Sequence, residues 1–446
     1  MKSILILGAG LSASSLIRYF LNNSEANGWT ISVCDQDLDL VKAKLNGHKN
    51  GIPLSFNALD PKQRRPEIEK SDIVISMLPA RFHVDVAKDC IELKTNLITP
   101  SYISPEMEEL DQAAKDAGIV IMNEIGVDPG LDHMSAMKVI NEIKAKGGEL
   151  IGFESFTGGL IAPDSDNNPW NYKLTWNPRN VVLAGQGGAA KFIQEGKYKY
   201  IPYNRLFRRT EIIEIEGYGQ FEGYANRNSL SYRETYGLEG IPTIFRGTLR
   251  RKGFSKAWSI FIQMGATDDT YTLEDSKNMT KREFINSFLP YHPTDSVELK
   301  LRYNMKIDQD DAIWDKLVWL GIFEDEGFEL ESDVTPAQYL QKIIEEKWVL
   351  DPEDKDMLVM WHKFNYTLNG KGYELTSHMI NIGEDQVYTS MSNTVGLPAA
   401  ICGKMILNGT ITAKGVTLPT HKDIYTPILE ELKEYDIFFI EKEIAQ

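Results

Sequence analysis

The chain has 446 residues and a formal net charge of −16, with 48 lysines and arginines against 64 aspartates and glutamates. A field of that sign argues against nucleic acid or an anionic membrane as the main partner. Hydrophobic residues make up 42% of the chain, enough for the cores of two or three globular domains. Only three cysteines occur, without C-x-x-C spacing, so we expect neither disulfides nor a metal site.

The location of the protein is predicted from the same features. No apolar stretch approaches the length that spans a bilayer. The N-terminus enters an apolar strand pattern at once, which leaves no room for a signal peptide. Because the cysteine usage is also that of a reduced compartment, we expect a cytoplasmic protein without a membrane partner.

The first 35 residues have the pattern of a dinucleotide-binding unit. An apolar strand at 4–7 runs into G-x-G-x-x-A at 8–13, followed by a helix and a second strand at 30–34. The loop residues expected to hold the pyrophosphate are Gly8, Gly10, Leu11, Ser12 and Ala13. Asp35 ends the second strand, where a carboxylate accepts from a ribose 2′-OH and repels a 2′-phosphate. The pattern therefore favours NAD, with NADP as the alternative.

Strands and helices continue to alternate up to residue 125. Further strands are predicted at 52–56, 72–79, 96–99 and 119–122, with helices at 82–93 and 105–117. This is an α/β pattern, typical of a Rossmann fold with a doubly wound parallel sheet.

The pattern changes after residue 150. Strand-like segments at 149–157, 210–218, 243–252, 356–365 and 373–382 predict a second α/β domain for substrate binding and dimerisation. The segment 269–350 is predicted to be an all-helical insertion, and helices with an apolar run after residue 389 are expected to return to the first domain. The predicted ranges are 1–125 and 390–446 for the Rossmann domain, 126–268 and 351–389 for the substrate domain, and 269–350 for the insertion.

Two loops are expected to open onto the nicotinamide crevice, because each follows a parallel strand at the carboxyl edge of the sheet. The loop at 100–102 contains Tyr102, and the loop at 123–133 contains Asp128 and His133. A phenol, a carboxylate and an imidazole suit a reaction that couples hydride loss to deprotonation. The alternative is that residues 128–130 are only a turn and His133 only begins a helix.

Two arginines in the second domain indicate a substrate with carboxylates. Arg227 lies in a polar segment, and Arg246 lies on a strand next to Gly247, which would permit close approach of a backbone. Guanidinium groups bind carboxylates through two parallel hydrogen bonds. The alternative is surface ion pairs. Lys173 and Trp176 are further pocket candidates, and Arg250 is expected on a solvated face.

Several longer motifs together are similar to one family. The chain contains SMLP, TPSYISPEMEELDQAAKDAGI, NEIGVDPGLDHMSAM, FTGGLIAPDSDNNPWNYKLTW, GYANRNS, FRGTLRRKG and TVGLPAAICGKMILNGTITAKGV. These stretches resemble saccharopine dehydrogenase of the glutamate-forming type, and the related C-terminal part of aminoadipic semialdehyde synthase. The resemblance covers nearly the whole chain. It implies a Rossmann domain, an α/β substrate domain and a helical domain.

The resemblance also implies which residues contact the ligands. The implied saccharopine contacts are Ser101, Tyr102, Asp128, Arg227, Arg246, Gly247 and Thr248. The implied cofactor contacts are the loop at 8–13, Asp35, Leu78, Pro100, Val127, Asp128, Pro129 and Trp176. Fungal members look NADP-dependent and carry a basic residue near the end of the second strand, so Asp35 is a departure that points to NAD.

The implied reaction is oxidation of the CH–NH bond of saccharopine to glutamate and aminoadipate semialdehyde, a step of lysine metabolism. The catalytic candidates are Asp128 and Tyr102, with His133 behind them. Two alternatives remain open: a carboxynorspermidine dehydrogenase-like polyamine enzyme, whose pocket should be richer in acids, and a non-catalytic NAD-binding protein. A homodimer formed through the second sheet is expected.

Overall fold

The computed structural model describes residues 2–446. Its internal contacts divide the chain into two compact units, Met1–Leu150 with Asn365–Gln446, and Ile151–Phe364. The three predicted domain ranges stay a prediction, since the contacts divide the chain into two units and not into three domains.

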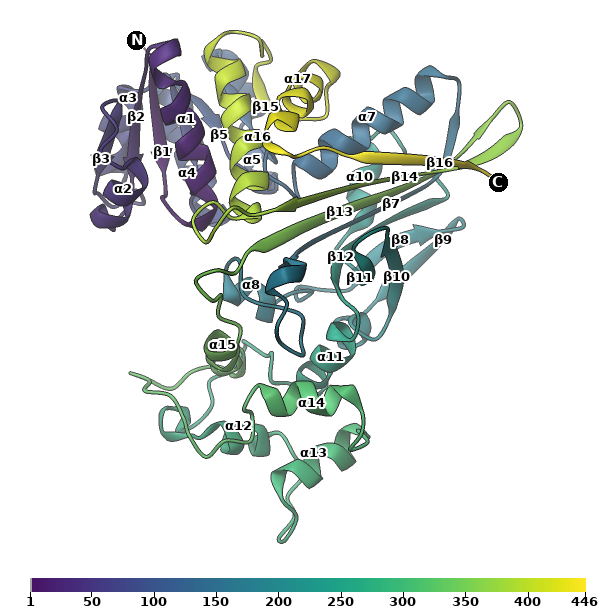
Figure 1. Ribbon diagram of the computed structural model, residues 1–446. Coiled ribbons are helices and arrows are strands. Elements are labelled where there is room, and N and C mark those ends of the chain that lie inside the picture. The colour runs from purple at the N-terminus through teal and green to yellow at the C-terminus, as the bar shows by residue number, and fades with distance from the viewer. Residues whose placement is uncertain (1) are drawn as a thin grey trace. The chain divides into compact units, whose positions relative to one another are not determined.

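The first unit is built on a seven-stranded sheet with the order β15-β6-β5-β4-β1-β2-β3. All of its pairs are parallel, and the expected α/β doubly wound fold is confirmed (Figure 1). Buried apolar runs form the central strands because a parallel sheet is covered on both faces. The strands are β1 Lys2–Leu7, β2 Trp29–Cys34, β3 Gly51–Leu54, β4 Ile73–Ser76, β5 Asn96–Ile98, β6 Val120–Met122 and β15 Gly415–Thr417.

Helices connect and cover these strands, and several begin at a side-chain cap. Asp37, Asp60 and Ser104 each accept from a backbone N–H of the helix that follows, as N-cap residues do. The helices are α1 Ser14–Asn27, α2 Leu38–Leu45, α3 Pro61–Glu69, α4 His83–Leu93, α5 Pro105–Glu108, α6 Asp111–Ala117, α7 Leu131–Ala145, α16 Ser390–Leu407 and α17 Lys422–Leu432. Short 3-10 turns are η1 Leu11–Ala13, η2 Ala80–Phe82 and η6 Lys433–Tyr435.

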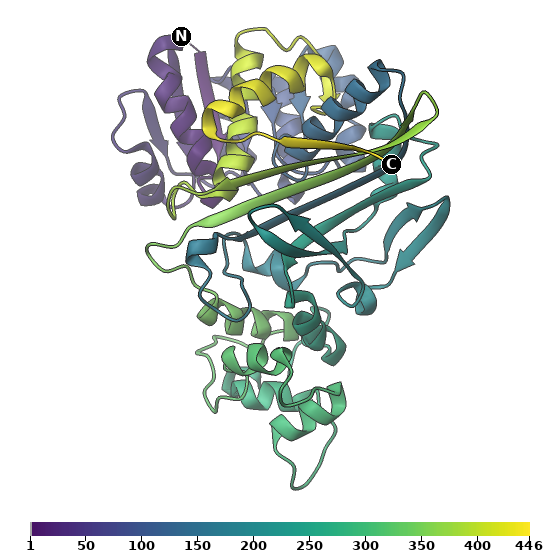
Figure 2. The ribbon, with the colours of Figure 1, turned by 45° about the vertical axis from the view of Figure 1, so that its right-hand side comes forward.

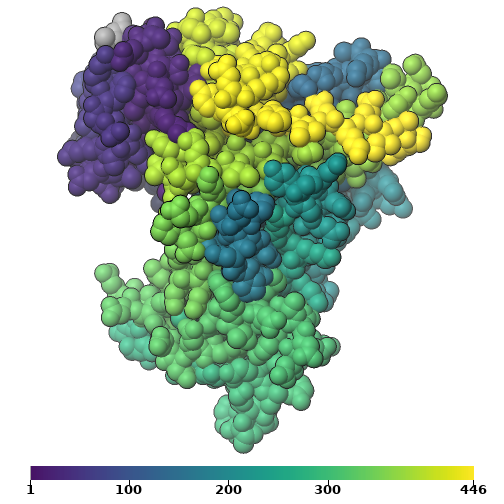
Figure 3. Space-filling model, viewed as in Figure 1, coloured from purple at the N-terminus to yellow at the C-terminus, as the bar shows by residue number. Residues whose placement is uncertain are grey.

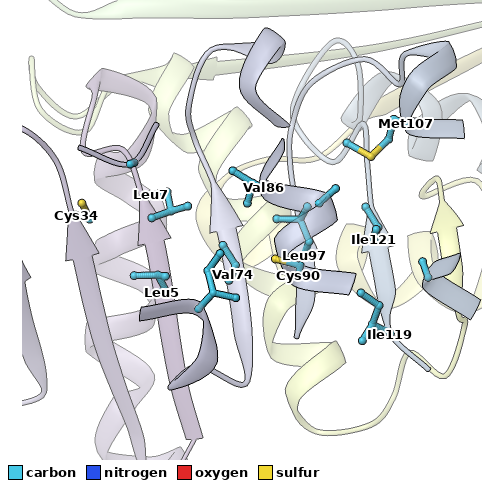
Figure 4. Close-up of a cluster of buried hydrophobic side chains, with 14 residues drawn as sticks. Leu5, Leu7, Cys34, Val74, Val86, Cys90, Leu97, Met107, Ile119 and Ile121 are labelled. Atoms are coloured by element: carbon cyan, nitrogen blue, oxygen red, sulfur yellow. The ribbon is translucent and has the colours of Figure 1, made fainter. Parts of the chain in front are cut away.

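One face of this sheet packs on a continuous apolar cluster. Leu5 and Leu7 from β1 meet Val74 from β4 and Leu97 from β5, all with no exposed surface (Figure 4). Cys90 of α4 completes the cluster from the helical layer. This core fixes the carboxyl ends of β1, β4 and β5 relative to one another, and those ends carry the candidate site.

The C-terminal helices also belong to the first unit, and α16 lies against α1. The Ser15 amide donates to Ser392 Oγ at 2.9 Å, and Ser15 Oγ donates to Asn393 Oδ1 at 2.6 Å. A Cβ added to Gly396 would lie 2.9 Å from the backbone N of Leu16, so glycine lets the two helices approach closely. The helix that begins at the glycine-rich loop is therefore supported by residues from the far end of the chain.

A second, mixed sheet has nine strands. Its path is β10-β11-β12-β7-β13-β14-β16, and β8 joins it at β12 and pairs with β9. The β7–β12 pair is parallel, whereas β10–β11, β11–β12 and β14–β16 are antiparallel. The strands are β7 Glu149–Ile161, β8 Ala190–Gln194, β9 Lys197–Ile201, β10 Thr210–Ile215, β11 Gly219–Ala225, β12 Thr243–Arg251, β13 Asp356–Leu368, β14 Lys371–Ile382 and β16 Ile440–Ala445.

The last strand belongs to the first unit but pairs in the second sheet. The apolar run at 437–440 was expected to return to the first domain, and the first unit does include it, but β16 begins at Ile440 and pairs with β14 of the second sheet. All six residues of β16 are exposed, and the strand is visible at the surface in Figure 3. β15 was not expected because it has only three residues, the first of which is Gly415, and so short a segment gives no pattern.

The regular elements between 265 and 350 are helices, as expected (Figure 2). The apolar side of α11 packs around Trp170, whose ring centroid lies 5.6 Å from Phe254 and 5.3 Å from Trp348. The helices of the second unit are α8 Pro178–Val182, α9 Tyr203–Leu206, α10 Tyr232–Thr235, α11 Phe254–Met264, α12 Lys281–Ser287, α13 Val297–Met305, α14 Ala312–Trp319 and α15 Pro336–Lys347. Its 3-10 turns are η3 Pro163–Ser165, η4 Ser229–Ser231 and η5 Ser276–Asn278. Among the described helices, none combines the length and apolar character that crossing a membrane requires.

Candidate functional site

The glycine-rich loop lies at the carboxyl end of β1 and has the geometry of a phosphate cradle. Gly8 has φ +101°, and a Cβ there would lie 3.1 Å from the carbonyl oxygen of Met77. Gly10 has open space where a side chain would stand. η1 has no side-chain N-cap, whereas in the first turn of α1 the Ser15 amide already donates to Ser392 Oγ. This arrangement fits a pyrophosphate, which accepts from N–H groups at a helix start.

Asp35 braces this loop from the end of β2. Its Oδ2 accepts from the Ala9 amide at 2.8 Å, and its Oδ1 accepts from the Asp37 amide at 3.2 Å. Both carboxylate oxygens are therefore engaged by backbone N–H groups of this unit. The carboxylate holds the loop in place, which is a structural task that the sequence pattern did not reveal.

Lys44 of α2 also contacts the loop. Its Nζ donates to the Gly10 carbonyl and to Ser14 Oγ, both at 2.7 Å. Burial lowers the pKa of Lys44 to about 8, and the nearby Asp35 opposes that shift. Sequence reasoning missed this residue, because no motif marks a lysine that reaches back from the following helix.

Tyr102 and Asp128 come together at the carboxyl edge of the sheet, as predicted from the positions of their loops. Tyr102 Oη donates to Asp128 Oδ1 at 2.8 Å, from the loops that follow β5 and β6. Tyr102 is 39% exposed and Asp128 is half-buried, so this pair is accessible to a ligand. Leu78, Pro100 and Ser101 are half-buried in loops at the same edge, whereas Val127 and Pro129 are buried.

His133 is placed beneath this edge and not on it. The imidazole has no exposed surface, and its Nε2 lies 2.6 Å from Glu124 Oε2. Glu124 Oε1 accepts from the Ile103 amide at 2.8 Å, and the Glu124 amide donates to the Ser101 carbonyl at 3.1 Å. The buried Glu124–His133 pair thus ties together the loops that carry Ser101 and Asp128. A direct catalytic role of His133 stays a prediction, and its position is that of a supporting residue.

A second buried histidine also contacts this edge and was missed from the sequence. His83 begins α4, and its ring nitrogens lie 3.0 Å from Ser76 Oγ and 2.9 Å from Ser101 Oγ. Burial lowers the pKa of His83 to about 4. The only sequence signal was its position a few residues after a strand that ends in the crevice.

The remaining candidates lie in the second unit, where Arg246 is buried on β12. Its guanidinium carbon lies 3.7 Å from the centroid of the Tyr232 ring, and its amide donates to Ser229 Oγ at 2.9 Å. Arg227 is exposed and has φ +38°. Thr248 is half-buried and lies two residues beyond Arg246, so both stand on the same face of the strand.

Glycine is needed at position 247 for a different reason than the expected close approach of a backbone. A Cβ at this position would lie 2.3 Å from the Phe156 ring and 2.6 Å from the Tyr224 carbonyl oxygen. Phe156 pairs with Gly247 across the parallel strands β7 and β12. The protein itself therefore requires the glycine, to make room for a buried ring. A close approach to a ligand is not needed to explain it.

Three further residues of this unit are also placed. Trp176 is half-buried, and its Nε1 donates to Tyr172 Oη at 3.4 Å. Lys173 is buried in ion pairs with Asp351 and Asp354, so its charge is already balanced within the unit. Arg250 was expected on a solvated face, but it is 3% exposed and lies near the rings of Tyr172, Tyr224 and Phe254.

The fold and this site define a class. A parallel nucleotide-binding sheet, an uncapped glycine-rich loop and an accessible phenol–carboxylate pair at its carboxyl edge are features of a Rossmann-type oxidoreductase. The chain belongs to the saccharopine dehydrogenase family. Residues 4–122 match the saccharopine dehydrogenase NADP binding domain, and residues 126–437 match the saccharopine dehydrogenase C-terminal domain. The resemblance expected from the sequence motifs is confirmed.

Individual relatives agree with the family. The chain is 34% identical to saccharopine dehydrogenase [NADP(+), L-glutamate-forming] of Saccharomyces cerevisiae, over all of both chains. It is 33% identical to the protein of the same name from Pyricularia oryzae, over 100% of this chain and 99% of the relative. Mouse mitochondrial alpha-aminoadipic semialdehyde synthase is 33% identical over 98% of this chain and 47% of its own length. The solved apo saccharopine dehydrogenase (L-Glu forming) from Saccharomyces cerevisiae superposes with TM-score 0.89 at 32% identity, covering all of both chains.

The comparisons also correct the expected cofactor. The preference for NAD, drawn from Asp35, is wrong: the matching family domain is NADP-binding, and the fungal relatives are named for NADP(+). The physical reason lies in the geometry. A carboxylate at this point reads the ribose only if its oxygens face the cofactor, and here they accept from the Ala9 and Asp37 amides.

Proposed function

We propose that the chain catalyses the reversible oxidation of saccharopine to L-glutamate and 2-aminoadipate 6-semialdehyde, with NADP as the cofactor, in lysine metabolism. The observation that carries the proposal is the accessible Tyr102–Asp128 pair, at 2.8 Å, at the carboxyl edge of the nucleotide-binding sheet. The match to relatives named for this activity over the full chain supports the same substrate and cofactor.

The reaction divides into a redox step and a hydrolytic step. NADP⁺, held by the loop at 8–13, would supply the acceptor for the hydride that leaves the ε-carbon of the lysine moiety. Loss of that hydride and of the amine proton leaves a carbon–nitrogen double bond in the substrate. Water adds to the carbon, and the carbon–nitrogen bond breaks as the nitrogen takes a proton. Glutamate leaves with the nitrogen, and the lysine moiety becomes the aldehyde.

The Tyr102–Asp128 pair suits the proton transfers of both steps. Asp128 takes the proton from the secondary ammonium of saccharopine and releases it to water, and it later takes the proton of the attacking water and gives it to the leaving nitrogen. Tyr102 donates to Asp128 already in this structure, so it keeps the carboxylate oriented while the proton moves. General acid–base catalysis of this kind contributes about 10²- to 10⁴-fold to a rate. The buried Glu124–His133 pair supports the two loops from below.

Substrate recognition must provide for three carboxylates in a protein of net charge −16. Arg246 and Arg227 are the proposed carboxylate partners, with Gly247 and Thr248 next to Arg246 and with Ser101 near the reacting pair. Arg246 is suited because a buried guanidinium in low dielectric binds a carboxylate strongly. The proposed cofactor contacts are the loop at 8–13, Leu78, Pro100, the turn at 127–129 and Trp176.

The proposal is tested by measuring the formation of NADPH from NADP at 340 nm with saccharopine as the substrate. Parallel assays replace NADP with NAD, or replace saccharopine with carboxynorspermidine as the control substrate. We expect turnover with saccharopine and NADP, with glutamate detected by mass spectrometry in equal amount to NADPH. Turnover only with carboxynorspermidine, or none with either substrate, would refute the proposal.

We also propose a cytoplasmic homodimer. The three cysteines are free and buried, as suits a reducing compartment. Light scattering coupled to gel filtration is expected to give twice the chain mass of 50.5 kDa, and a monomer mass would contradict the dimer.

A further inference from the structure

His83 links the ends of two neighbouring strands through its two ring nitrogens. Ser76 is the last residue of β4, Ser101 follows β5, and His83 begins α4 between them. The Nδ1 atom lies 3.0 Å from Ser76 Oγ, and Nε2 lies 2.9 Å from Ser101 Oγ. His83 is 3% exposed and Ser76 has no exposed surface, so bulk water does not compete for the contact between them.

The direction of this chain of hydrogen bonds follows from Ser76. Within residues 2–446 its hydroxyl has one hydrogen-bond partner, which is Nδ1 of His83. A hydroxyl carries a single proton, and a buried donor left unpaired is unfavourable. Ser76 therefore donates to Nδ1, which must accept. The ring proton is then on Nε2, because burial lowers the pKa of His83 to about 4 and keeps the imidazole neutral near pH 7.

This tautomer sets the role of Ser101. The Nε2–H group donates to Ser101 Oγ, so the serine oxygen acts as an acceptor toward the histidine. Across the described residues, the Ser101 hydroxyl proton finds no acceptor of its own, and the residue is half-buried beside Tyr102. Its hydroxyl thus presents a hydrogen-bond donor at the accessible edge where Tyr102 meets Asp128.

We propose that His83 is a positioning residue, which holds Ser101 so that its O–H group donates to a carboxylate oxygen of the bound substrate. The inference rests on the proposed function, since it takes saccharopine as the ligand. The ordered chain from Ser76 through His83 to Ser101 fixes the donor before the substrate arrives, which reduces the cost of orienting it.

Steady-state kinetics of a double-mutant cycle test the inference. In His83→Asn the shorter amide still faces Ser76 but does not reach Ser101, whereas the amide of His83→Gln reaches Ser101. We expect Ser101→Ala and His83→Asn each to raise the saccharopine KM roughly tenfold, the loss of one charge-assisted hydrogen bond. The double variant should be no worse than Ser101→Ala alone, and His83→Gln should restore most of the loss. The KM for NADP should change less than twofold.

Several results would overturn the inference. If the two single variants' fold-increases in saccharopine KM multiply in the double variant, His83 does not act through Ser101. A change in the KM for NADP, with that for saccharopine unchanged, would show the same. His421→Gln is the matched control, since that side chain is 72% exposed. If the wild-type enzyme does not oxidise saccharopine, the proposed function fails by itself, and the tautomer is then tested separately.

That separate test is ¹⁵N NMR of the protein labelled at histidine. Long-range nitrogen–proton correlations distinguish the two neutral tautomers, and the His83 signals are assigned by their loss in His83→Gln. We expect the proton on Nε2. A proton on Nδ1 would reverse the chain, leave Ser101 as the donor to His83, and refute the inference.

Discussion

Gly247→Ala separates a packing requirement from a ligand requirement at the same position. The added methyl carbon would lie 2.3 Å and 2.5 Å from two carbons of the Phe156 ring, and 2.6 Å from the Tyr224 carbonyl oxygen. Ordinary contact begins at about 3.5 Å, so something must move by about 1 Å. Phe156 has no exposed surface, and its ring packs on Phe245 and Trp361 with centroids 5.1 Å and 6.0 Å away. The ring therefore cannot turn aside without disturbing two further aromatic residues.

The expected cost follows from these overlaps. Overpacking a filled core by one methyl typically costs about 1–3 kcal/mol. Contact with a backbone oxygen as well as a confined ring places Gly247→Ala at about 3 kcal/mol. For a unit of this size, that corresponds to a fall in Tm of about 6–12 °C. Gly240→Ala is the matched control, because a Cβ there has nothing within 4 Å, and its Tm should change by less than about 2 °C.

The assay is thermal unfolding followed by circular dichroism without ligands, with saccharopine kinetics on the same samples. If Gly247→Ala kept the wild-type Tm and raised only the KM for saccharopine, the glycine would be serving the ligand, and the packing argument would be refuted.

Three other predictions concern the site, a buried ion pair and the thiols. Asp128→Asn should lower kcat/KM for saccharopine by about 10²- to 10⁴-fold while Tm stays within about 2 °C of wild type; an unchanged rate would remove Asp128 from the proton transfers. Asp89→Asn should cost about 3–5 kcal/mol in urea unfolding, because it leaves buried Arg64 without its partner at 2.6 Å. Lys115→Ala breaks the exposed pair with Asp111 and should lower the free energy of unfolding by less than about 1 kcal/mol. Equal losses of stability in the Asp89 and Lys115 variants would contradict the argument from burial. The three thiols, Cys34, Cys90 and Cys402, are buried, and burial raises their pKa, to about 11 for Cys34. The native protein should therefore be nearly inert to an aromatic disulfide reagent, and the protein in urea should react at all three thiols. Fast labelling of the native protein would contradict this prediction.

The nucleotide-binding sheet could be predicted in detail because each of its long strands has its own local signal. The strands β1 and β4 are apolar runs bounded by glycine or proline, and burial on both faces makes such runs unmistakable. The proximity of Tyr102 and Asp128 followed from the rule that loops after parallel strands share one edge.

What could not be predicted depends on contacts between residues far apart in sequence. The position of Asp35 agrees with the dinucleotide-binding pattern, but the hydrogen bonds that its carboxylate accepts from the Ala9 and Asp37 amides form only in the folded loop. Arg250 reads as a surface charge next to Arg251, yet three aromatic rings bury it. The roles of His83 and Glu124 likewise depend on partners that no spacing reveals.

The pairing of α16 with α1 has a consequence for how the protein is made. Ser15, beside the cofactor loop, is bonded to Ser392 and Asn393, which follow it by 377 and 378 residues. Because synthesis proceeds from the N-terminus, the first strands leave the ribosome long before this support exists. A chain interrupted before α16 would expose the apolar side of α1, and it would be a target for chaperones and proteases. The helix behind the glycine-rich loop thus gains its full set of contacts only when translation is nearly complete.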